Sequence, residues 1–405
     1  MTTQILQGVK VVDLTSVMLG PYATQILGDM GADVIKVESI HGGDVLRRGA
    51  PQKNRVGAAF MGLNRNKRSV ALDLASAEGR EALLKIVATA DVFVHNMRGS
   101  AAARLGLQYE QLKAVNPRLV YCASWGFGSN GPYAGKPAFD DIIQSLSGMA
   151  ALQGTVRGKP GFVPTAIVDK ITGLTTAYAI AMGLFQRERT GTGVSFEIPM
   201  FETAVSFLFI EHLGAAAFAD DDGATPGHPR QVMERGPFAT SDGHLTIMPY
   251  TGQQWRRFFE AAGRIDLASD PRVTDDILRN ENIELMMRWV AECVADKPTA
   301  YWLALLETND IPVAVTRSLD EVLTDPHLAA VGLLQQQMHP VTGATRSIAP
   351  PLLVDGERPA MRRPVPRLGE HTREILLEAG LAPEQVDRLL AAGIAAVTPP
   401  AGPAC

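Results

Sequence analysis

The segment LQGVKVVDLTSVMLGPYATQILGDMGADVIKVE, residues 6–38, decides the fold. Residues 9–14 and 32–38 are mainly apolar runs, which predict two buried strands. Between them, Pro21 occupies a place that the first turn of a helix tolerates, and Gly31 a place where a helix ends. A strand, a short helix and a second strand within about 30 residues form a βαβ unit, which implies a parallel sheet with a right-handed crossover.

The same alternation continues along the chain. Strands are predicted over 91–95, 119–124 and 194–198, and helices over 76–88, 109–115, 169–190 and 201–218. This order predicts a doubly wound, Rossmann-like α/β domain. The glycines near the first helix (Gly20, Gly28 and Gly31) lack the spacing G-x-G-x-x-G, which argues against a nicotinamide dehydrogenase.

A second, smaller α+β domain is expected further along. The pattern predicts a strand over 244–249 and helices over 252–262, 276–294 and 298–308. Beyond this domain, two last helices are predicted over 370–379 and 383–391. The polar segment ADDDGATPGHP, residues 219–229, has the composition of a linker.

Composition excludes several classes of protein. The 405 residues are 46% hydrophobic and carry a net charge of −5, which is unlike a general binder of nucleic acid or anionic membrane. Three scattered cysteines (Cys122, Cys293 and Cys405) exclude a disulfide scaffold and favour a reducing compartment, and no two of the eight histidines are close enough to predict a metal pair. Because neither a signal peptide nor a membrane-spanning run is evident, we expect a cytoplasmic enzyme.

One stretch of this acidic chain is purely basic. Residues 45–72 contain seven basic side chains and no acidic one: Arg47, Arg48, Lys53, Arg55, Arg65, Lys67 and Arg68. Guanidinium groups bind phosphate in bidentate fashion, so the stretch is a candidate site for a phosphorylated ligand. The simpler interpretation is a solvated loop.

Three further features are candidates for chemistry. Asp169 opens the predicted long helix, where the helix dipole favours its ionised form; it is either an N-cap or a nucleophile that forms a covalent acyl intermediate. Residues 96–98 (Asn-Met-Arg) follow a predicted parallel strand, at the sheet edge where such folds bind ligands, although Asn and Arg are also ordinary loop residues. Residues 124–133 (SWGFGSNGPY) form a Gly-rich turn that allows close approach to a ligand, and turn formation alone explains it equally well.

Together these segments resemble the class III CoA-transferases, the family of formyl-CoA transferase and carnitine CoA-transferase that also contains α-methylacyl-CoA racemase. The resemblance runs through residues 6–38, GLNRNKRSVALDL, ADVFVHNMRGSAAARLGL, SWGFGSNGPYAGKPAFD and residues 169–193, and returns at LGEHTREIL. It covers nearly the whole chain, and the motifs occur in the family's order.

The resemblance implies a mechanism and a set of contacts. Asp169 takes the place of the family's nucleophile, which attacks the acyl-CoA thioester, gives a mixed anhydride and then an aspartyl-CoA thioester, and passes CoA to an acceptor acid. Coenzyme A is then a co-substrate, and no metal is expected. The implied CoA contacts are Met18, Leu19, Leu72, Asp73, Leu74, Ala75, Asn96, Met97, Arg98, Arg104, Lys136 and Asp140.

The chain departs from parts of the family pattern. The racemase branch places a His where this chain has Phe139, which cannot move a proton, so transfer is favoured over racemisation. Many relatives carry a Gln near Met18 that stabilises the oxyanion; here main-chain N–H groups or other donors must replace it. Some relatives carry a basic residue at Ser39, near the adenine. The Gly-rich substrate loop of the formyl-CoA enzymes is missing after Pro229, which argues against oxalate and formate as substrates.

The resemblance also implies an interlocked homodimer. The expected organisation is a CoA-binding domain over 1–218, a linker over 219–229, a small domain over 230–330 and a C-terminal part over 331–405 that returns to the large domain. The expected partners are an acyl-CoA and a small carboxylic acid, with no nucleic acid or membrane. The alternatives are a CoA-thioester racemase and a non-catalytic CoA-binding protein.

Overall fold

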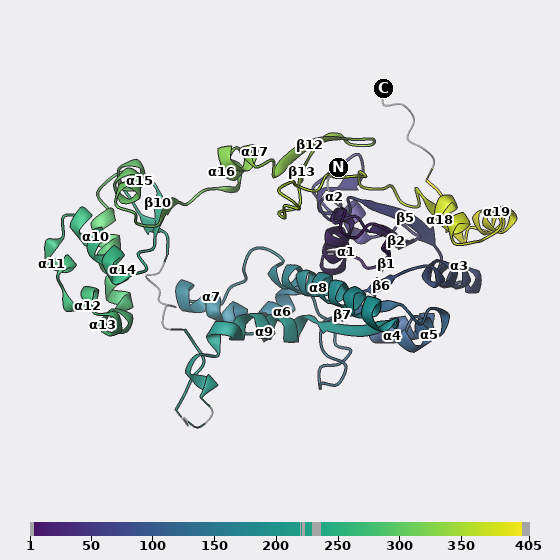
Figure 1. Ribbon diagram of the computed structural model, residues 1–405, viewed down its shortest axis with the longest axis horizontal. Helices are drawn as coiled ribbons and strands as arrows, with labels where there is room; N and C mark the ends of the chain where they lie inside the picture. The colour runs from purple at the N-terminus through teal and green to yellow at the C-terminus, as the bar shows by residue number, and fades with distance from the viewer. Residues whose placement is uncertain (1–3, 219, 221–222, 229–235, 399–405) are drawn as a thin grey trace. The chain divides into compact units, whose positions relative to one another are not determined.

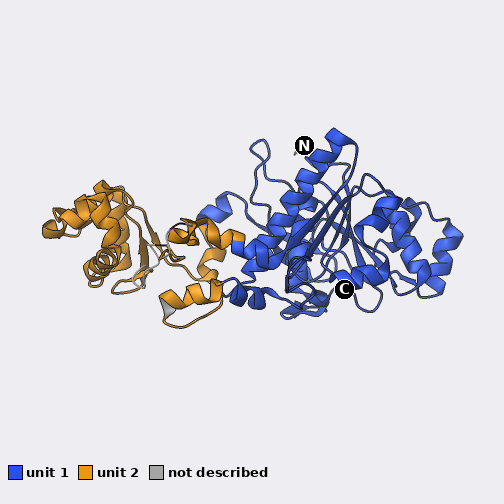
Figure 2. Cartoon of the chain, turned by 90° about the horizontal axis from the view of Figure 1, so that it is seen from below, with its two compact units in different colours: residues 1–147, 164–205, 326–405 blue, residues 148–163, 206–325 orange. Residues whose placement is uncertain are grey.

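The computed structural model describes residues 4–218, 220, 223–228 and 236–398, and within these it divides the chain into two compact units. Unit 1 comprises 1–147, 164–205 and 326–405, and unit 2 comprises 148–163 and 206–325 (Figure 2). The predicted domain bounds at 218, 230 and 330 stay a prediction. The predicted linker at 219–229 falls partly on residues outside the described ones.

A seven-stranded sheet forms the centre of unit 1 (Figure 1). The strands are β1 (Lys10–Leu14), β2 (Asp33–Ser39), β5 (Lys67–Leu72), β6 (Val92–His95), β7 (Val120–Trp125), β8 (Val194–Pro199) and β14 (Ala395–Ala396), in the order β14-β5-β2-β1-β6-β7-β8. All neighbours pair in parallel except β14, which is antiparallel to β5. The predicted parallel α/β sheet is therefore confirmed. The predicted strands at 9–14, 32–38, 91–95, 119–124 and 194–198 match five of these strands to within one or two residues.

Alternation along the strands creates a core on each face of the sheet. On one face Val11, Val34, Val92 and Val120 pack with residues of α1 (Leu19–Asp29) and α8 (Ile167–Thr190). On the other face Val12, Ile35, Phe93 and Tyr121 pack with four further helices: α3 (Ala77–Ala88), α5 (Tyr109–Val115), α18 (Thr372–Glu378) and α19 (Pro383–Ala391). The end of the chain therefore completes a core that its beginning starts.

The remaining elements of unit 1 surround this sheet. They are the 3₁₀ helix η1 (Val45–Arg48), the pair β3 (Gln52–Lys53) and β4 (Val56–Gly57), α2 (Ala58–Leu63), α4 (Gly99–Leu105), α6 (Asp140–Leu146), the start of α9 (Met200–His212), α17 (Pro326–Ala330) and the hairpin β12 (Leu334–His339) with β13 (Gly343–Ile348). The observed helix α9 is shorter than the helix predicted over 201–218. It ends at His212, and a 3₁₀ turn, η2 (Gly214–Ala217), follows.

Unit 2 has a core of its own. It contains α7 (Met149–Arg157), β9 (Phe238–Ala239), β10 (His244–Ile247), β11 (Val313–Val315), and helices α10 (Gly252–Ala261), α11 (Ile265–Ala268), α12 (Pro271–Thr274), α13 (Asp276–Glu281), α14 (Ile283–Val294), α15 (Thr299–Thr308) and α16 (Leu319–Leu323). The three strands form an antiparallel sheet in the order β11-β10-β9. The single helix predicted over 276–294 is wrong, since Asn282 separates α13 from α14.

Candidate active site

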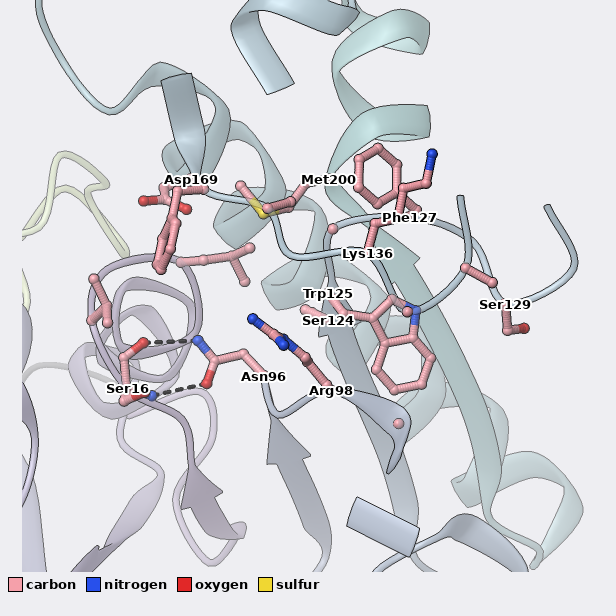
Figure 3. Close-up of a pocket in the computed structure, with 18 of the residues that line it drawn as sticks. Ser16, Asn96, Arg98, Ser124, Trp125, Phe127, Ser129, Lys136, Asp169 and Met200 are labelled. Carbon is pink, nitrogen blue, oxygen red and sulfur yellow. Dashed lines mark hydrogen bonds between the residues drawn. The ribbon is translucent and has the colours of Figure 1, made fainter. Parts of the chain in front are cut away.

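The site lies where the winding of the sheet reverses. In the sheet, β2 and β5 lie on one side of β1, and β6, β7 and β8 lie on the other. The connections that leave the carboxyl ends of β1 and β6 therefore run to opposite sides, which makes this the topological switch point of the sheet. Ser16 follows β1 and Asn96 follows β6. The two residues exchange hydrogen bonds: Ser16 N–H donates to Asn96 Oδ1 (2.9 Å), and Asn96 Nδ2 donates to Ser16 O (2.7 Å) (Figure 3).

A cavity of about 540 Å³ opens at this point, entirely within unit 1. Its walls come from four segments: 16–19 after β1, 96–100 after β6, the turn 124–139 after β7, and the starts of α8 and α9. Most of the wall is apolar. The charged lining groups are Arg98, Lys136 and Asp169, and neither Arg98 nor Lys136 forms an ion pair with another described residue. Lys136 Nζ lies over the ring of Tyr133, 4.3 Å from its centroid.

Asp169 is the third residue of α8, whose N-cap is Ala166, so the N-cap interpretation of Asp169 is wrong. Its backbone N–H donates to Asp140 Oδ2 at 2.9 Å, and Gln144 Nε2 donates to the other oxygen of Asp140 at 2.6 Å. Asp140 therefore holds the first turn of α8. The carboxylate of Asp169 accepts no hydrogen bond from any described side chain or backbone group, and it lines the cavity.

Two effects disfavour the charge on Asp169. Burial raises its pKa to about 7, and the neighbouring negative charge of Asp140 adds to the rise. The helix dipole favours the charged form, but its effect is smaller than that of burial and Asp140. The expectation that the dipole keeps Asp169 ionised is therefore wrong below the raised pKa. Near neutral pH a substantial fraction of the side chain is a poorly solvated carboxylate, a form that is able to act as a nucleophile.

The Gly-rich turn after β7 is tied down by two glutamates. Glu197 of β8 accepts hydrogen bonds from Trp125 Nε1 (2.9 Å) and from Ser129 N (2.6 Å) and Oγ (2.7 Å), while Glu202 of α9 accepts one from Gly128 N (2.8 Å). A Cβ at Gly128 would lie 2.5 Å from Glu202 Oε1, so a larger residue at this position would displace the Glu202 carboxylate. The turn is thus a fixed wall of the cavity.

A buried histidine supports the loop that follows β6. Burial lowers the pKa of His95 to about 4, so the ring is neutral. Its Nδ1 accepts the N–H of Met97 (3.2 Å), so Nε2 carries the proton and donates to Tyr121 Oη (2.7 Å). Tyr121 in turn donates to Leu107 O (3.2 Å).

The basic stretch is mostly committed to internal ion pairs. Arg47 pairs with Glu38, Arg65 with Asp29, Lys67 with Asp13, and Arg68 with Asp33, Glu374 and Glu378. For these four side chains, the interpretation as a phosphate site and the interpretation as a solvated loop are therefore both wrong. Arg48, Lys53 and Arg55 form no ion pair with a described residue.

The structure brings six of the thirteen predicted site residues together. Met18, Leu19, Asn96, Arg98, Lys136 and Asp169 all line the cavity. The other predicted contacts lie outside its wall: Leu72 ends β5, Asp73, Leu74 and Ala75 precede α3, Met97 packs against the core, Arg104 is exposed on α4, and Asp140 lies behind Asp169. Their role in CoA binding stays a prediction.

Some residues that shape the cavity were not predicted. Ser16 and Met200 line it, and Glu197 and Asp44 support its walls. A serine directly after the first strand was the one available signal. Among the described residues, no cluster of three or more potential metal ligands occurs, and no helix is long and apolar enough to cross a membrane.

Known proteins resemble this chain over almost its full length. The model of CoA-transferase family III matches residues 6–372. A succinyl-CoA:glutarate CoA-transferase from Mus musculus is 32% identical over 394 residues, covering 96% of this chain and 90% of that protein. A succinyl-CoA:mesaconate CoA-transferase from Haloarcula hispanica is 33% identical, with 93% and 96% covered. The crystal structure of a CAIB/BAIF family protein from Brucella suis superposes with a TM-score of 0.78 at 30% identity, with 94% and 100% covered.

Proposed function

The chain belongs to CoA-transferase family III, and we propose that it moves CoA from an acyl-CoA donor to a carboxylic acid through a covalent intermediate on Asp169. The observation that carries this proposal is the Asp169 carboxylate, which lines the cavity at the start of α8 and accepts no hydrogen bond from a described residue.

The reaction begins with attack of Asp169 on the thioester carbonyl carbon. The C–S bond breaks, the CoA thiolate leaves, and a mixed anhydride forms. The thiolate then attacks the aspartyl carbonyl, which releases the donor acid and leaves an aspartyl-CoA thioester. The acceptor carboxylate attacks this thioester, which releases the CoA thiolate and forms a second mixed anhydride. The thiolate then attacks the acceptor acyl carbon of this anhydride, which gives the new acyl-CoA and regenerates Asp169.

Two backbone groups support stabilisation of the developing oxyanion. The N–H groups of Met18 and Leu19, at the start of α1, donate to no described acceptor, and both residues line the cavity. Unpaired N–H groups at a helix start favour negative charge. They would replace the glutamine that this chain lacks.

A small dicarboxylic acid is the proposed acceptor, with its CoA thioester as donor. The named relatives act on succinyl-CoA with glutarate or mesaconate. Arg98, which lines the cavity without an ion-pair partner among the described residues, supports recognition of a second carboxylate. The racemase alternative is disfavoured, because the cavity presents Phe139 where a second proton carrier is needed.

Trapping the intermediate tests the proposal. With succinyl-CoA and hydroxylamine, mass spectrometry should find a hydroxamate at Asp169, and Asp169→Ala should abolish both the hydroxamate and transfer to glutarate. The matched control is Asp141→Ala, which removes an exposed carboxylate of α6 and should leave both unchanged. Full transfer activity in Asp169→Ala would refute the mechanism. Deuterium exchange at the α-carbon without an acceptor would instead indicate a racemase.

We also propose a homodimer, supported by the exposed face of α8. Leu174, Tyr178, Met182 and Phe185 follow one another at helical spacing and are 48–64% exposed. Contiguous apolar surface of this kind marks an interface. Tyr178→Asp should lower the mass measured by light scattering to that of one chain, and an unchanged mass would contradict the proposal. The interlocked arrangement and the cytoplasmic location stay predictions.

A further inference from the structure

Four charged side chains are buried beneath the segment that connects β1 to α1. Lys67 Nζ lies 3.0 Å from Asp13 Oδ2, and Lys36 Nζ lies 3.0 Å from Asp44 Oδ2. None of the four side chains is more than marginally exposed. Burying charges costs free energy even when they are paired, so buried ion pairs of this kind are weak evidence for stability and favour a role other than stabilisation.

Three of these side chains, Asp13, Lys36 and Asp44, form hydrogen bonds with backbone groups of Thr15 and Val17. Thr15 N–H donates to Asp13 Oδ1 (3.0 Å), and Thr15 O accepts from Lys36 Nζ (2.9 Å). Val17 N–H donates to both oxygens of Asp44 (3.3 Å each). With the Asn96 bonds to Ser16, the segment has little freedom to move.

Val17 is the strained point of this segment. Its φ of 68° lies in the left-handed region, which a β-branched residue rarely adopts. Such a conformation persists only where the surrounding structure enforces it. Val17, Met18 and Leu19 line the cavity that contains Asp169, so the conformation of Val17 sets the position of this wall.

Asp44 is itself firmly positioned. Its Oδ1 accepts the N–H of Leu46 (3.0 Å) at the start of η1, and its own N–H donates to Glu38 Oε1 (3.1 Å). Glu38 is fixed in turn by Arg47, at 2.6 and 2.7 Å. Asp44 is therefore the point where β2, η1 and the cavity wall meet.

We propose that Asp44 is a positioning residue for the transfer reaction: with Lys36 it holds Val17 in its left-handed conformation and so aligns the Val17–Leu19 wall with Asp169. This inference rests on the proposed function. Asp44 does not line the cavity, so its effect passes through Val17.

Kinetics of a double-mutant cycle test the proposal. Asp44→Asn should lower kcat for transfer from succinyl-CoA to glutarate by about 10- to 100-fold, with KM changed less than about threefold, because misplacement of a wall by about 1 Å costs this much. Glycine adopts positive φ without strain, so in a Val17→Gly background the same substitution should cost less than about threefold in kcat. An equal loss in both backgrounds overturns the proposal.

Asp29→Asn is the matched control. It breaks another buried ion pair, between Asp29 and Arg65, whose residues do not line the cavity. It should lower stability and leave kcat unchanged. A kcat loss equal to that of Asp44→Asn would show that general destabilisation explains both, and would overturn the proposal.

Hydrogen exchange separates this inference from the proposed function. In the wild-type protein the amides of Thr15 to Val17 should exchange slowly, and Asp44→Asn should accelerate exchange at Val17, whether or not transfer occurs. Fast exchange of all three amides in the wild-type protein overturns the positioning role, even if Asp44→Asn does not fold. Slow exchange without any transfer activity would instead refute the proposed function alone.

Discussion

Replacement of Asp169 by asparagine should abolish transfer and, at the same time, stabilise the fold. Above neutral pH the wild-type protein carries a carboxylate where burial and Asp140 disfavour charge, whereas asparagine has the same shape and no charge. The pKa of about 7 compares with an ordinary value of 3.8. A pKa difference of about 3 corresponds to about 4 kcal/mol. Because the side chain is partly open to the cavity, solvent screening reduces the expected gain to about 2–4 kcal/mol.

The gain should depend on pH in one direction. With a raised pKa, the folded protein holds the Asp169 proton more tightly than the unfolded chain between pH 3.8 and about 7. The cost of the charge is therefore absent below pH 3.8, grows as the pH rises, and is complete above about 7. An asparagine side chain at this position bears no such cost, so Asp169→Asn should gain little below pH 3.8, about half of the full amount at pH 5.5 and the most at pH 8.5.

Urea unfolding of both proteins at pH 5.5 and 8.5 measures this difference. Protein concentration must be held constant, because the stability of the proposed dimer would depend on it. Asp141→Asn on the exposed side of α6 is the control and should change the free energy of unfolding by less than about 0.5 kcal/mol. If Asp169→Asn is no more stable than the wild-type protein at pH 8.5, the reasoning from burial is refuted.

Three further predictions concern the charges of unit 1. The acid limb of the pH profile of kcat/KM should have its midpoint near pH 7. Asp140→Asn should move this midpoint to lower pH, but not to the ordinary aspartate pKa, because burial is the larger cause of the raised pKa of Asp169. An unchanged midpoint would contradict this. Lys136→Ala should raise KM for succinyl-CoA about tenfold at constant kcat, since removing a charged contact made equally in ground and transition states weakens binding alone. A fall in kcat at unchanged KM would disagree. Lys67→Met should lower the free energy of unfolding by about 3–5 kcal/mol in urea titrations, because the buried Asp13 loses its partner at 3.0 Å; a loss below about 1 kcal/mol would be inconsistent.

The strands of the sheet were predictable where they are apolar runs, and not where charged residues are buried in them. Strands such as 9–14 are apolar runs, and the structure confirms them. β5 escaped prediction because it begins with Lys67 and Arg68, whose charge is typical of a loop. Both are buried in the sheet because each meets carboxylates contributed by distant segments, which no local pattern reveals.

The same limit applies to the site. Asp169 was predictable because it begins a long helix and occupies a known motif position. Its raised pKa was not, since this depends on burial and on Asp140, 29 residues away. The apolar spacing of α8 correctly predicted a helix, yet Leu174 and Phe185 lie on its exposed face. The buried face combines apolar residues such as Ile180 with small and polar ones such as Thr176 and Gly183.

The contribution of both chain ends to unit 1 has a consequence for biosynthesis. The core on one face of the sheet includes Ile375, Leu376, Val386 and Leu389, and β14 covers the edge of β5. A nascent chain emerging from the ribosome therefore exposes that face, and the open edge of β5, until residues 372–396 have been translated. Exposed strand edges and apolar faces promote aggregation. Unit 2, whose core lies within one stretch of chain, can fold meanwhile, so unit 1, which contains the site, is completed after unit 2.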